Sequence, residues 1–126
     1  MNNDNNKNLV SIKGGVYFIL NSSGETINSV IVSYYSGWKQ ERFIQKIENL
    51  YNLEMAESGC LFTYQTTEAN NKDHWDVDFR TTTGKAVSYR KQKCHIQDND
   101  NGVVILNVTK DFKLYIRFSN SGGCYI

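Results

Sequence analysis

Residues 74–93 carry the most regular pattern in the chain, an alternation of apolar and polar side chains that is typical of two paired strands. Trp75, Val77 and Phe79 fall on one face of the first strand. The other face carries four polar side chains: His74, Asp76, Asp78 and Arg80. We therefore expect a β-hairpin with one face buried in a core and the other face in water.

The turn of this hairpin determines which residues lie opposite each other. A three-residue loop that ends at Gly84, with Gly84 in the left-handed conformation, places Phe79 opposite Val87 and Asp76 opposite Arg90. A two-residue loop would mix the apolar and the polar face. The three-residue loop is therefore favoured.

The beginning of the chain divides into two parts. Residues 1–8 contain five asparagines and too little apolar surface to offset the entropy of ordering, so they are expected to form a flexible lead. Strand-like segments follow, with apolar and β-branched residues at 16–20 and 27–35 and a turn between them. These two segments are expected to pair as an N-terminal β-hairpin.

A helix is predicted over about residues 38–51, after a cap at Ser36. Apolar side chains recur there at spacings of three and four residues, at Trp38, Phe43, Ile44, Ile47, Leu50 and Tyr51. Charged residues lie between them, which is the pattern of an amphipathic helix. Residues 53–57 fit either a continuation of the helix or the start of a strand.

The remainder of the chain has the composition of an antiparallel meander with strands at 60–66, 74–81, 85–94, 103–108 and 112–118. A three-residue loop between the last two strands would place Leu106 opposite Leu114 and Val108 opposite Phe112. The expected architecture is a single α+β domain over residues 9–126, with the helix packed on the apolar face of the meander.

Charge, hydropathy and cysteine content exclude several classes of protein. A net charge of +1 provides no global field for nucleic acid or an anionic membrane, and no segment approaches the apolar length of a membrane span. Cys60, Cys94 and Cys124 are an odd number without the spacing of a disulfide framework or a zinc site. The chain is expected to be soluble and cytoplasmic, with all three thiols reduced.

The polar face of the hairpin is the part of the sequence where ionisable groups concentrate. His74, Asp76 and Asp78 could hold a divalent metal, but an ordinary solvated strand face with Asp76 paired to Arg90 is the favoured interpretation. The run 98–102 resembles the opening of a calcium loop and lacks its later acidic ligands, so a turn is favoured there. No metal, cofactor or catalytic motif is assigned.

The leading hypothesis is a small binding protein that inhibits a larger macromolecule through a protein–protein interface, as immunity proteins do with toxins and phage anti-defence proteins do with defence components. It rests on opposite charges on adjacent strands and on eight tyrosines, a residue that suits protein recognition. The predicted contact residues are His74, Asp76, Asp78, Arg80, Tyr89, Arg90, Lys91 and Lys93. Trp75 is expected to lie in the core.

Three alternatives stay open. The first is a small nuclease or toxin domain that uses His74, Asp76 and His95 for acid–base chemistry. The second is a small-molecule or carbohydrate binder that uses Trp38 or Trp75. The third is a homodimer formed through a free strand edge at 112–118, although the lysine and arginine in that strand oppose it. Binding of nucleic acid by the basic residues of 85–93 is disfavoured by the acids on the neighbouring strand.

Overall fold

The computed structural model describes residues 12–36, 39–66 and 73–126. Two predictions fall outside this part of the chain. They are the flexible lead at residues 1–8 and Trp38, the first apolar residue of the predicted helix and a candidate ligand-binding residue. Within these residues the elements are strands β1 (Lys13–Asn21), β2 (Ile27–Ser36), β3 (Lys39–Leu50), β4 (Cys60–Tyr64), β5 (Asp73–Thr81), β6 (Ala86–Lys93), β7 (Val103–Val108), β8 (Leu114–Arg117) and β9 (Cys124–Tyr125), and a short 3-10 turn, η2 (Lys110–Phe112).

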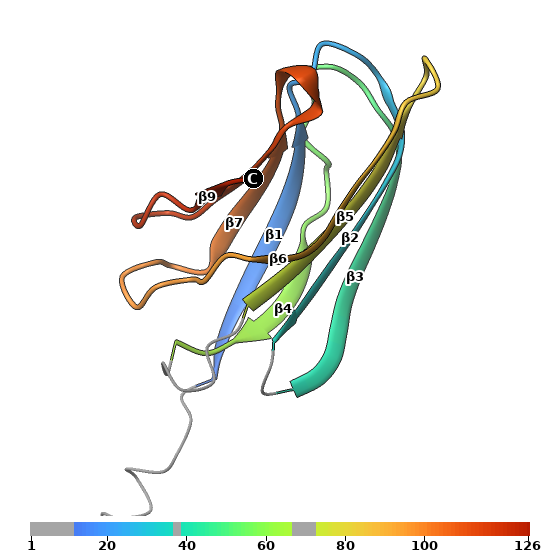
Figure 1. The fold of residues 1–126 in the computed structure, drawn as a ribbon. Coiled ribbons are helices and arrows are strands. Elements are labelled where there is room, and N and C mark those ends of the chain that lie inside the picture. Colours follow the sequence, from blue (N-terminus) through green and yellow to red (C-terminus); the bar gives the residue numbers. More distant parts are fainter. Residues whose placement is uncertain (1–11, 37–38, 67–72) are drawn as a thin grey trace, which may run out of the picture.

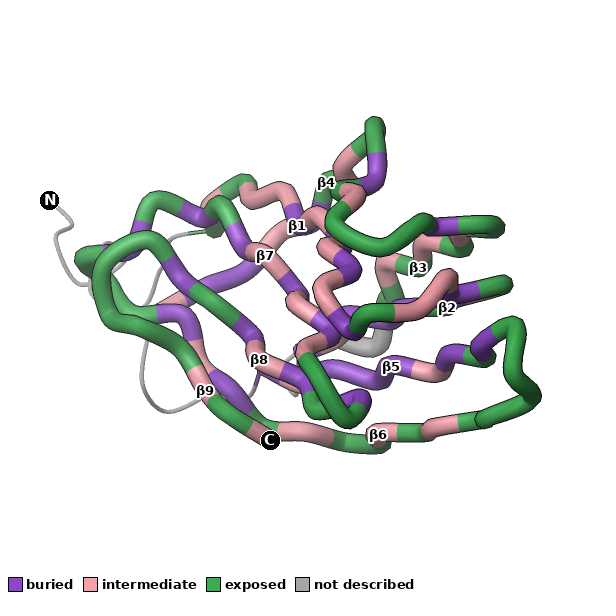
Figure 2. Tube along the Cα trace, turned by 90° about the horizontal axis from the view of Figure 1, so that it is seen from above, coloured by how far each residue is buried: buried purple, intermediate pink, exposed green. Residues whose placement is uncertain are grey.

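The strands form two sheets that face each other as a β-sandwich (Figure 1). One sheet has the order β4-β1-β7-β8-β9 and the other has the order β3-β2-β5-β6. Strands β1 and β7 run parallel, and every other described pair is antiparallel. Buried residues alternate with more exposed ones along the strands (Figure 2), so the core lies between the two sheets.

The predicted α+β fold is wrong, because the segment predicted as an amphipathic helix is strand β3. Phe43 and Ile47, four residues apart, lie on one face of a helix, but they also lie on one face of a strand because four is an even number. Both side chains pack against the core, whereas Ile44 is 57% exposed on the other face. Strand β3 pairs with β2 over nine residue pairs, which provides hydrogen-bond partners for the backbone of β3. This pairing favours the strand, with its period of two residues, over the helix.

The predicted N-terminal hairpin is also wrong. Strands β1 and β2 belong to different sheets, and the turn between them crosses from one sheet to the other (Figure 1). The side chain of buried Asn21 holds this crossing by donating hydrogen bonds to the carbonyls of Glu25 (2.7 Å) and Leu50 (2.9 Å). The chain after β3 continues beside β1, where Met55 forms an isolated bridge to Leu20. Residues 53–57 are therefore neither helix nor a full strand.

The hairpin of β5 and β6 confirms the predicted register. Phe79 lies opposite Val87, and Gly84 has a φ of 90° in the turn. The pairing shifts between Trp75 and Val77, where β6 bulges. The predicted register of the last hairpin is wrong by two residues: Leu106 lies opposite Ile116, because the turn after β7 is longer than three residues. A shift of two keeps the inward faces inward.

The predicted single meander is not formed, since its strands divide between the two sheets. Strand β4 pairs with β1, and β8 pairs with both β7 and β9. The strand edge proposed for homodimerisation at 112–118 is therefore occupied by β9 on the side away from β7.

An aromatic cluster fills the centre of the sandwich. Trp75 is fully buried, as expected, and its ring lies 4.8 Å from the ring of Tyr34, 5.8 Å from Tyr17 and 5.8 Å from Phe62, measured between centroids. Its indole N–H donates to the carbonyl of Cys94 at 3.0 Å. Residues from both sheets meet in this cluster, so Trp75 connects the two layers.

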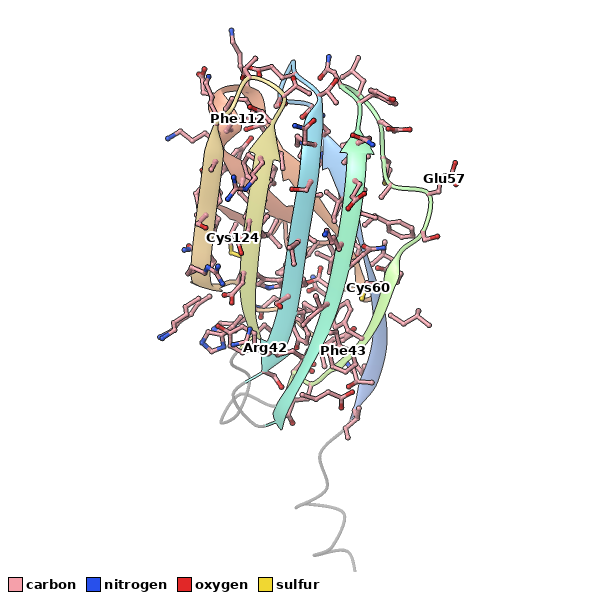
Figure 3. The ribbon with its side chains drawn as sticks, turned by 90° about the vertical axis from the view of Figure 1, so that its right-hand side faces the viewer. Arg42, Phe43, Glu57, Cys60, Phe112 and Cys124 are labelled. Atoms are coloured by element: carbon pink, nitrogen blue, oxygen red, sulfur yellow. A yellow bond between two sulfur atoms is a disulfide. The ribbon has the colours of Figure 1, made fainter. Side chains whose placement is uncertain are left out.

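The expectation of three reduced thiols is wrong, because Cys94 and Cys124 form a disulfide. The bond joins the segment that follows β6 of the four-stranded sheet to strand β9 of the five-stranded sheet (Figure 3). It therefore links the two sheets covalently. Cys60 is a free thiol. No helix in the described part of the chain is long and apolar enough to cross a membrane.

Candidate functional site

The polar residues of β5 lie where the alternation placed them. His74, Asp78 and Arg80 are at least partly exposed on the outer side of the sheet, opposite the buried Trp75, Val77 and Phe79. Asp76 lies on the same outer side but is buried. Figure 3 shows this side of the sandwich, with β6, β5, β2 and β3 next to one another.

The sheet order extends this surface over four strands. The register places Tyr35 of β2 between Arg42 of β3 and His74 of β5, and it places Lys93 of β6 beside His74. We call the polar outward side chains of this sheet the polar outer face: Ser29, Ser33, Tyr35, Arg42, Lys46, Glu48, His74, Asp76, Asp78, Arg80, Ser88, Arg90 and Lys93. Two exposed isoleucines, Ile31 and Ile44, lie among them.

Asp76 is the centre of a hydrogen-bond network on this face. One carboxylate oxygen accepts from the backbone N–H of Lys91 (2.7 Å) and the hydroxyl of Tyr35 (3.3 Å), and the other accepts from Arg42 (3.2 Å). Arg90 adds an ion pair at 3.8 Å. The Asp76 side chain is only 10% exposed, so it neutralises the two arginines from below and leaves them at the surface.

A stack of three planar groups lies beside this network. The guanidinium of Arg42 lies 3.9 Å from the ring centroid of Tyr35, and the Tyr35 ring stacks on His74 at 5.1 Å with an interplanar angle of 7°. Partial burial, followed by the nearby Asp76 carboxylate, raises the pKa of the Tyr35 hydroxyl. The hydroxyl is therefore a hydrogen-bond donor at neutral pH, as its bond to Asp76 requires.

The predicted charge pairs of the hairpin are formed. Arg90 binds Asp78 at 2.8 Å and also reaches Asp76, and the hydroxyl of Ser88 donates to Asp78. The Arg90 side chain is 63% exposed, and pairs of this kind contribute about 0–1 kcal/mol to stability. Their main effect is to hold the side chains in one arrangement.

Two predicted contact residues have structural roles. Tyr89 points toward the core, where its ring lies 6.4 Å from that of Phe79 and its hydroxyl donates to the carbonyl of Phe112 at 2.7 Å. Lys91 lies in the bulge with a φ of 53°, and its backbone N–H serves Asp76. The exposed side chain of Lys91 adds positive charge at the margin of the polar outer face.

The two histidines of the nuclease hypothesis have separate roles. His74 stacks on Tyr35, and the Nδ1 atom of His95 accepts the backbone N–H of Asp73 at 3.0 Å. Within residues 12–36, 39–66 and 73–126, no group of three or more His, Cys, Asp or Glu side chains is placed to hold a metal. Burial of Trp75 excludes it as an exposed platform for a sugar.

Residues 98–102 form a turn, as predicted from the sequence. Burial of Asp100 acts to raise the pKa of its carboxyl, but hydrogen bonds from Ser121, Gln97 and Asn120 outweigh burial and lower it. The bonds from Asn120 and Ser121 join the turn before β7 to the loop after β8, and the bond from Gln97 lies within the turn. Asp100 therefore has a structural role, since its carboxylate connects the two loops.

Asp73 is a buried carboxyl at the first residue of β5. Burial raises its pKa to about 6, although hydrogen bonds donated by the hydroxyl of Tyr34 and by the N–H of Ile96 (2.9 Å) act in the opposite direction. The folded state therefore binds this proton more tightly than the unfolded chain does. A raised carboxyl pKa makes the folded state less stable as pH rises through the window between the unfolded and the folded value.

We expect the contribution of Asp73 to the free energy of unfolding to fall by about 2 kcal/mol between pH 4 and pH 7, because the unfolded carboxyl is already largely ionised at pH 4 and the folded one, with a pKa of about 6, is not. Asp73→Asn keeps an acceptor for Ile96 and removes the titration. Urea unfolding of both proteins at pH 4, 5, 6 and 7 measures the difference between their stability curves, which cancels the other carboxyls. Parallel curves for the two proteins would contradict a raised pKa for Asp73.

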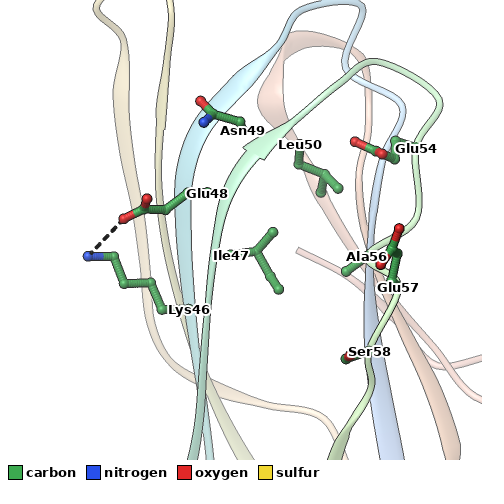
Figure 4. Close-up of a pocket in the computed structure, with 9 residues that line it drawn as sticks. All are labelled: Lys46, Ile47, Glu48, Asn49, Leu50, Glu54, Ala56, Glu57 and Ser58. Atoms are coloured by element: carbon green, nitrogen blue, oxygen red, sulfur yellow. Dashed lines mark ion pairs between the residues drawn. The ribbon is translucent and has the colours of Figure 1, made fainter.

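A shallow depression of about 340 Å³ lies between the edge of β3 and the chain that follows it (Figure 4). Its lining includes Lys46 and Glu48, which form an ion pair at 3.4 Å, and Glu54, whose carboxylate accepts the N–H of Tyr51 at 2.9 Å. These local contacts engage three of its charged side chains, and we assign the depression no ligand.

A second outer surface was missed by the sequence reasoning. Most outward side chains of the other sheet are apolar, and we call these the apolar outer face: Val16, Phe18, Leu20, Leu61, Val103, Ile105 and Tyr115. Thr63, Asn107 and Arg117 also point to this side. The signal was present in the unbroken apolar run from Val16 to Leu20, because a strand with one face in water alternates. Its inward residues, Tyr17 and Ile19, are fully buried.

Comparison of the chain with known protein families finds no family that matches, and a search of curated proteins finds no relative.

Proposed function

We propose that this protein binds a larger protein through the polar outer face and inhibits it by covering the contacted surface. The observation that carries the proposal is the network around Asp76, which holds Arg42, Tyr35 and Arg90 in a fixed array at the surface. Arginine and tyrosine are the residue types that contribute most to protein interfaces.

Preorganisation supports a role in binding. Long side chains usually lose about 0.5–1.5 kcal/mol each in conformational entropy when an interface immobilises them. Arg42 is already held between Asp76 and the Tyr35 ring, and Arg90 is held by two aspartates. Less of this entropy remains to be lost when a partner binds.

The charges of the face favour an acidic protein as the partner. Cationic side chains outnumber acidic ones on it: Arg42, Lys46, Arg80, Arg90 and Lys93 against Glu48, Asp76 and Asp78. The aspartates lie between the cations rather than at the margin, which would repel a continuous phosphate backbone. A protein surface with separated carboxylates matches this pattern better.

The compartment is part of the proposal. The sequence led us to expect a cytoplasmic protein with three reduced thiols, whereas Cys94 and Cys124 are joined. Disulfides persist in oxidising compartments and are rare in the cytosol. We therefore place the encounter with the partner in an oxidising environment.

The proposal is tested with the double variant Arg42→Glu with Lys93→Glu. Both residues lie on the polar outer face and are exposed, and the N–H of Lys91 and the ion pair with Arg90 still hold Asp76 in the variant, so the fold should be retained. Partners are captured on immobilised wild-type protein from the source of the protein, identified by mass spectrometry and then purified for titration. We expect the variant to weaken binding of the purified partner at least ten-fold, through loss and reversal of two contacts worth about 1.4 kcal/mol or more together.

The matched control is Lys110→Glu with Lys113→Glu, which makes the same change in charge at exposed residues in and next to η2, outside the polar outer face. It should bind as the wild type does. Equal binding by the Arg42/Lys93 variant and the wild type would refute the proposed surface. Capture of nucleic acid alone would refute the proposed class of partner.

A further inference from the structure

A hollow opens in the polar outer face near the turn of the β5–β6 hairpin, beside the network around Asp76. Its volume is about 370 Å³, and β2, β5 and β6 all contribute to its lining. Short side chains occupy three lining positions, and two arginines stand next to them: Ser29, Ala86 and Ser88 with Arg80 and Arg90. The hollow therefore results from small residues placed beside long ones on three neighbouring strands (Figure 3).

The two arginines differ in what they already bind. Arg90 is held by Asp78 at 2.8 Å and by Asp76 at 3.8 Å. Arg80 is exposed, and no acid among the described residues lies within ion-pair distance of its guanidinium. A guanidinium has five N–H donors in a planar fork that matches a carboxylate. The binding capacity that remains in the hollow is therefore that of a cationic donor.

The acid in the lining, Asp78, is already engaged. One of its carboxylate oxygens accepts the hydroxyl of Ser88, and the other binds Arg90. A cationic side chain from a partner would have to compete with Arg90 for Asp78. A carboxylate could bind Arg80 and leave the contacts of Asp78 unchanged. The hollow therefore favours an anionic group over a cationic one.

The remaining lining suits a short aliphatic stem. Ile31 is 39% exposed and lies opposite Asp78. Ala86 is exposed and lies opposite Arg80. These two apolar side chains can contact the methylene groups that connect a carboxylate to a peptide backbone.

We propose that the hollow receives a carboxylate side chain of the partner protein and acts as the specificity pocket of the polar outer face. The inference rests on the proposed function and deepens it, because it names the group that the face recognises. Arg80 would bind the carboxylate, and Ile31 and Ala86 would contact its stem. A neutral amide at the same place would leave Arg80 buried in the interface without an opposite charge, which is how a polar pocket rejects a near isostere.

Nuclear magnetic resonance tests the hollow without the partner. The ¹⁵N-labelled full chain is titrated to about 50 mM with acetyl-Gly-Glu-Gly-amide or with its neutral counterpart acetyl-Gly-Gln-Gly-amide, since a single contact of this size binds in the millimolar range. We expect the glutamate peptide alone to cause saturable shifts of the Ala86 and Ser88 amide signals and of the Arg80 Nε signal.

Two variants separate charge from shape. Arg80→Gln removes the charge, and Ala86→Leu fills the hollow with the charge unchanged. Each should abolish the saturable shifts, and both residues are exposed, so the fold should be retained. The matched control is Lys110→Gln, which loses the same charge at an exposed residue outside the polar outer face. It should bind the glutamate peptide as the wild type does.

The same variants are then compared on the purified partner. Arg80→Gln and Ala86→Leu should each weaken its binding about ten-fold or more, and only Arg80→Gln should reduce the dependence of binding on salt. Lys110→Gln should bind the partner as the wild type does.

Three results with the peptides would each overturn the proposal: no saturable shifts, equal shifts with the glutamine peptide, or shifts that persist in Arg80→Gln. Stronger partner binding by Ala86→Leu would show that an apolar side chain enters the hollow. Loss of partner binding in the Arg42/Lys93 variant alone would refute the hollow and keep the proposed function. Saturable peptide binding with unchanged partner binding by the Arg42/Lys93 variant would refute the proposed function and keep the carboxylate site.

Discussion

Replacing Trp75 with alanine is expected to lower the free energy of unfolding by about 3–5 kcal/mol, the usual cost of deleting a large buried aromatic side chain. The side chain is fully buried and contacts the rings of Tyr17, Tyr34 and Phe62. Its loss would leave a cavity between the two sheets and remove the donor to the carbonyl of Cys94. Urea unfolding followed by far-UV circular dichroism measures the change without using tryptophan fluorescence.

The control for this substitution is Ile44→Ala. Ile44 is 57% exposed on the outer side of β3, and surface changes usually stay within about 0.5 kcal/mol. Trp75→Phe should fall between the two, because it keeps ring contacts and loses the hydrogen bond. A cost below about 1 kcal/mol for Trp75→Ala would contradict the position of Trp75 at the centre of the core.

Removing the disulfide by Cys94→Ala with Cys124→Ala is expected to lower the free energy of unfolding by about 3–4 kcal/mol. The bond spans 30 residues, and closing a loop of that length restricts the unfolded chain. The two-residue strand β9 should also loosen, since its other anchors are its short pairing with β8, the bond from the N–H of Ile126 to Leu114 (2.9 Å) and the stacking of Tyr125 on Tyr115. Unfolding with and without reductant measures the effect.

The control is Cys60→Ala, because Cys60 is the free cysteine. It should change stability by about 1 kcal/mol or less. Reductant should weaken the wild type and Cys60→Ala but leave the double variant unchanged. The unfolded, unreduced wild type should titrate as one thiol. Three titratable thiols in that state would refute the bond and, with it, the proposed oxidising compartment.

The sequence predicted what local geometry determines. In the hairpin of β5 and β6 the strands are neighbours in the chain, and the turn at Gly84 sets the register, so the pairing of Phe79 with Val87 follows from a few adjacent residues. The burial of Trp75 and the outward row from His74 to Arg80 follow from the same alternation. Half of the candidate site was therefore accessible from the sequence.

Tertiary pairing decided the rest. A four-residue spacing such as that of Phe43 and Ile47 suits a helix and a strand equally, and only the partner strand β2 selects the strand. Arg42 and Tyr35 join the polar outer face for the same reason, because their strands are placed beside β5 by backbone hydrogen bonds between distant segments. The periodicity of a local segment cannot predict hydrogen bonds to a distant strand.

The amino-acid sequence by itself determined which side of a strand each residue takes, because side chains alternate along any extended chain. The tertiary structure alone decided which strands became neighbours. It paired β1 in parallel with β7, it joined Cys94 to Cys124, and it left an apolar sheet face outside the core. These contacts join residues far apart in the chain, and their free energy depends on the packing of the whole sandwich rather than on any one segment.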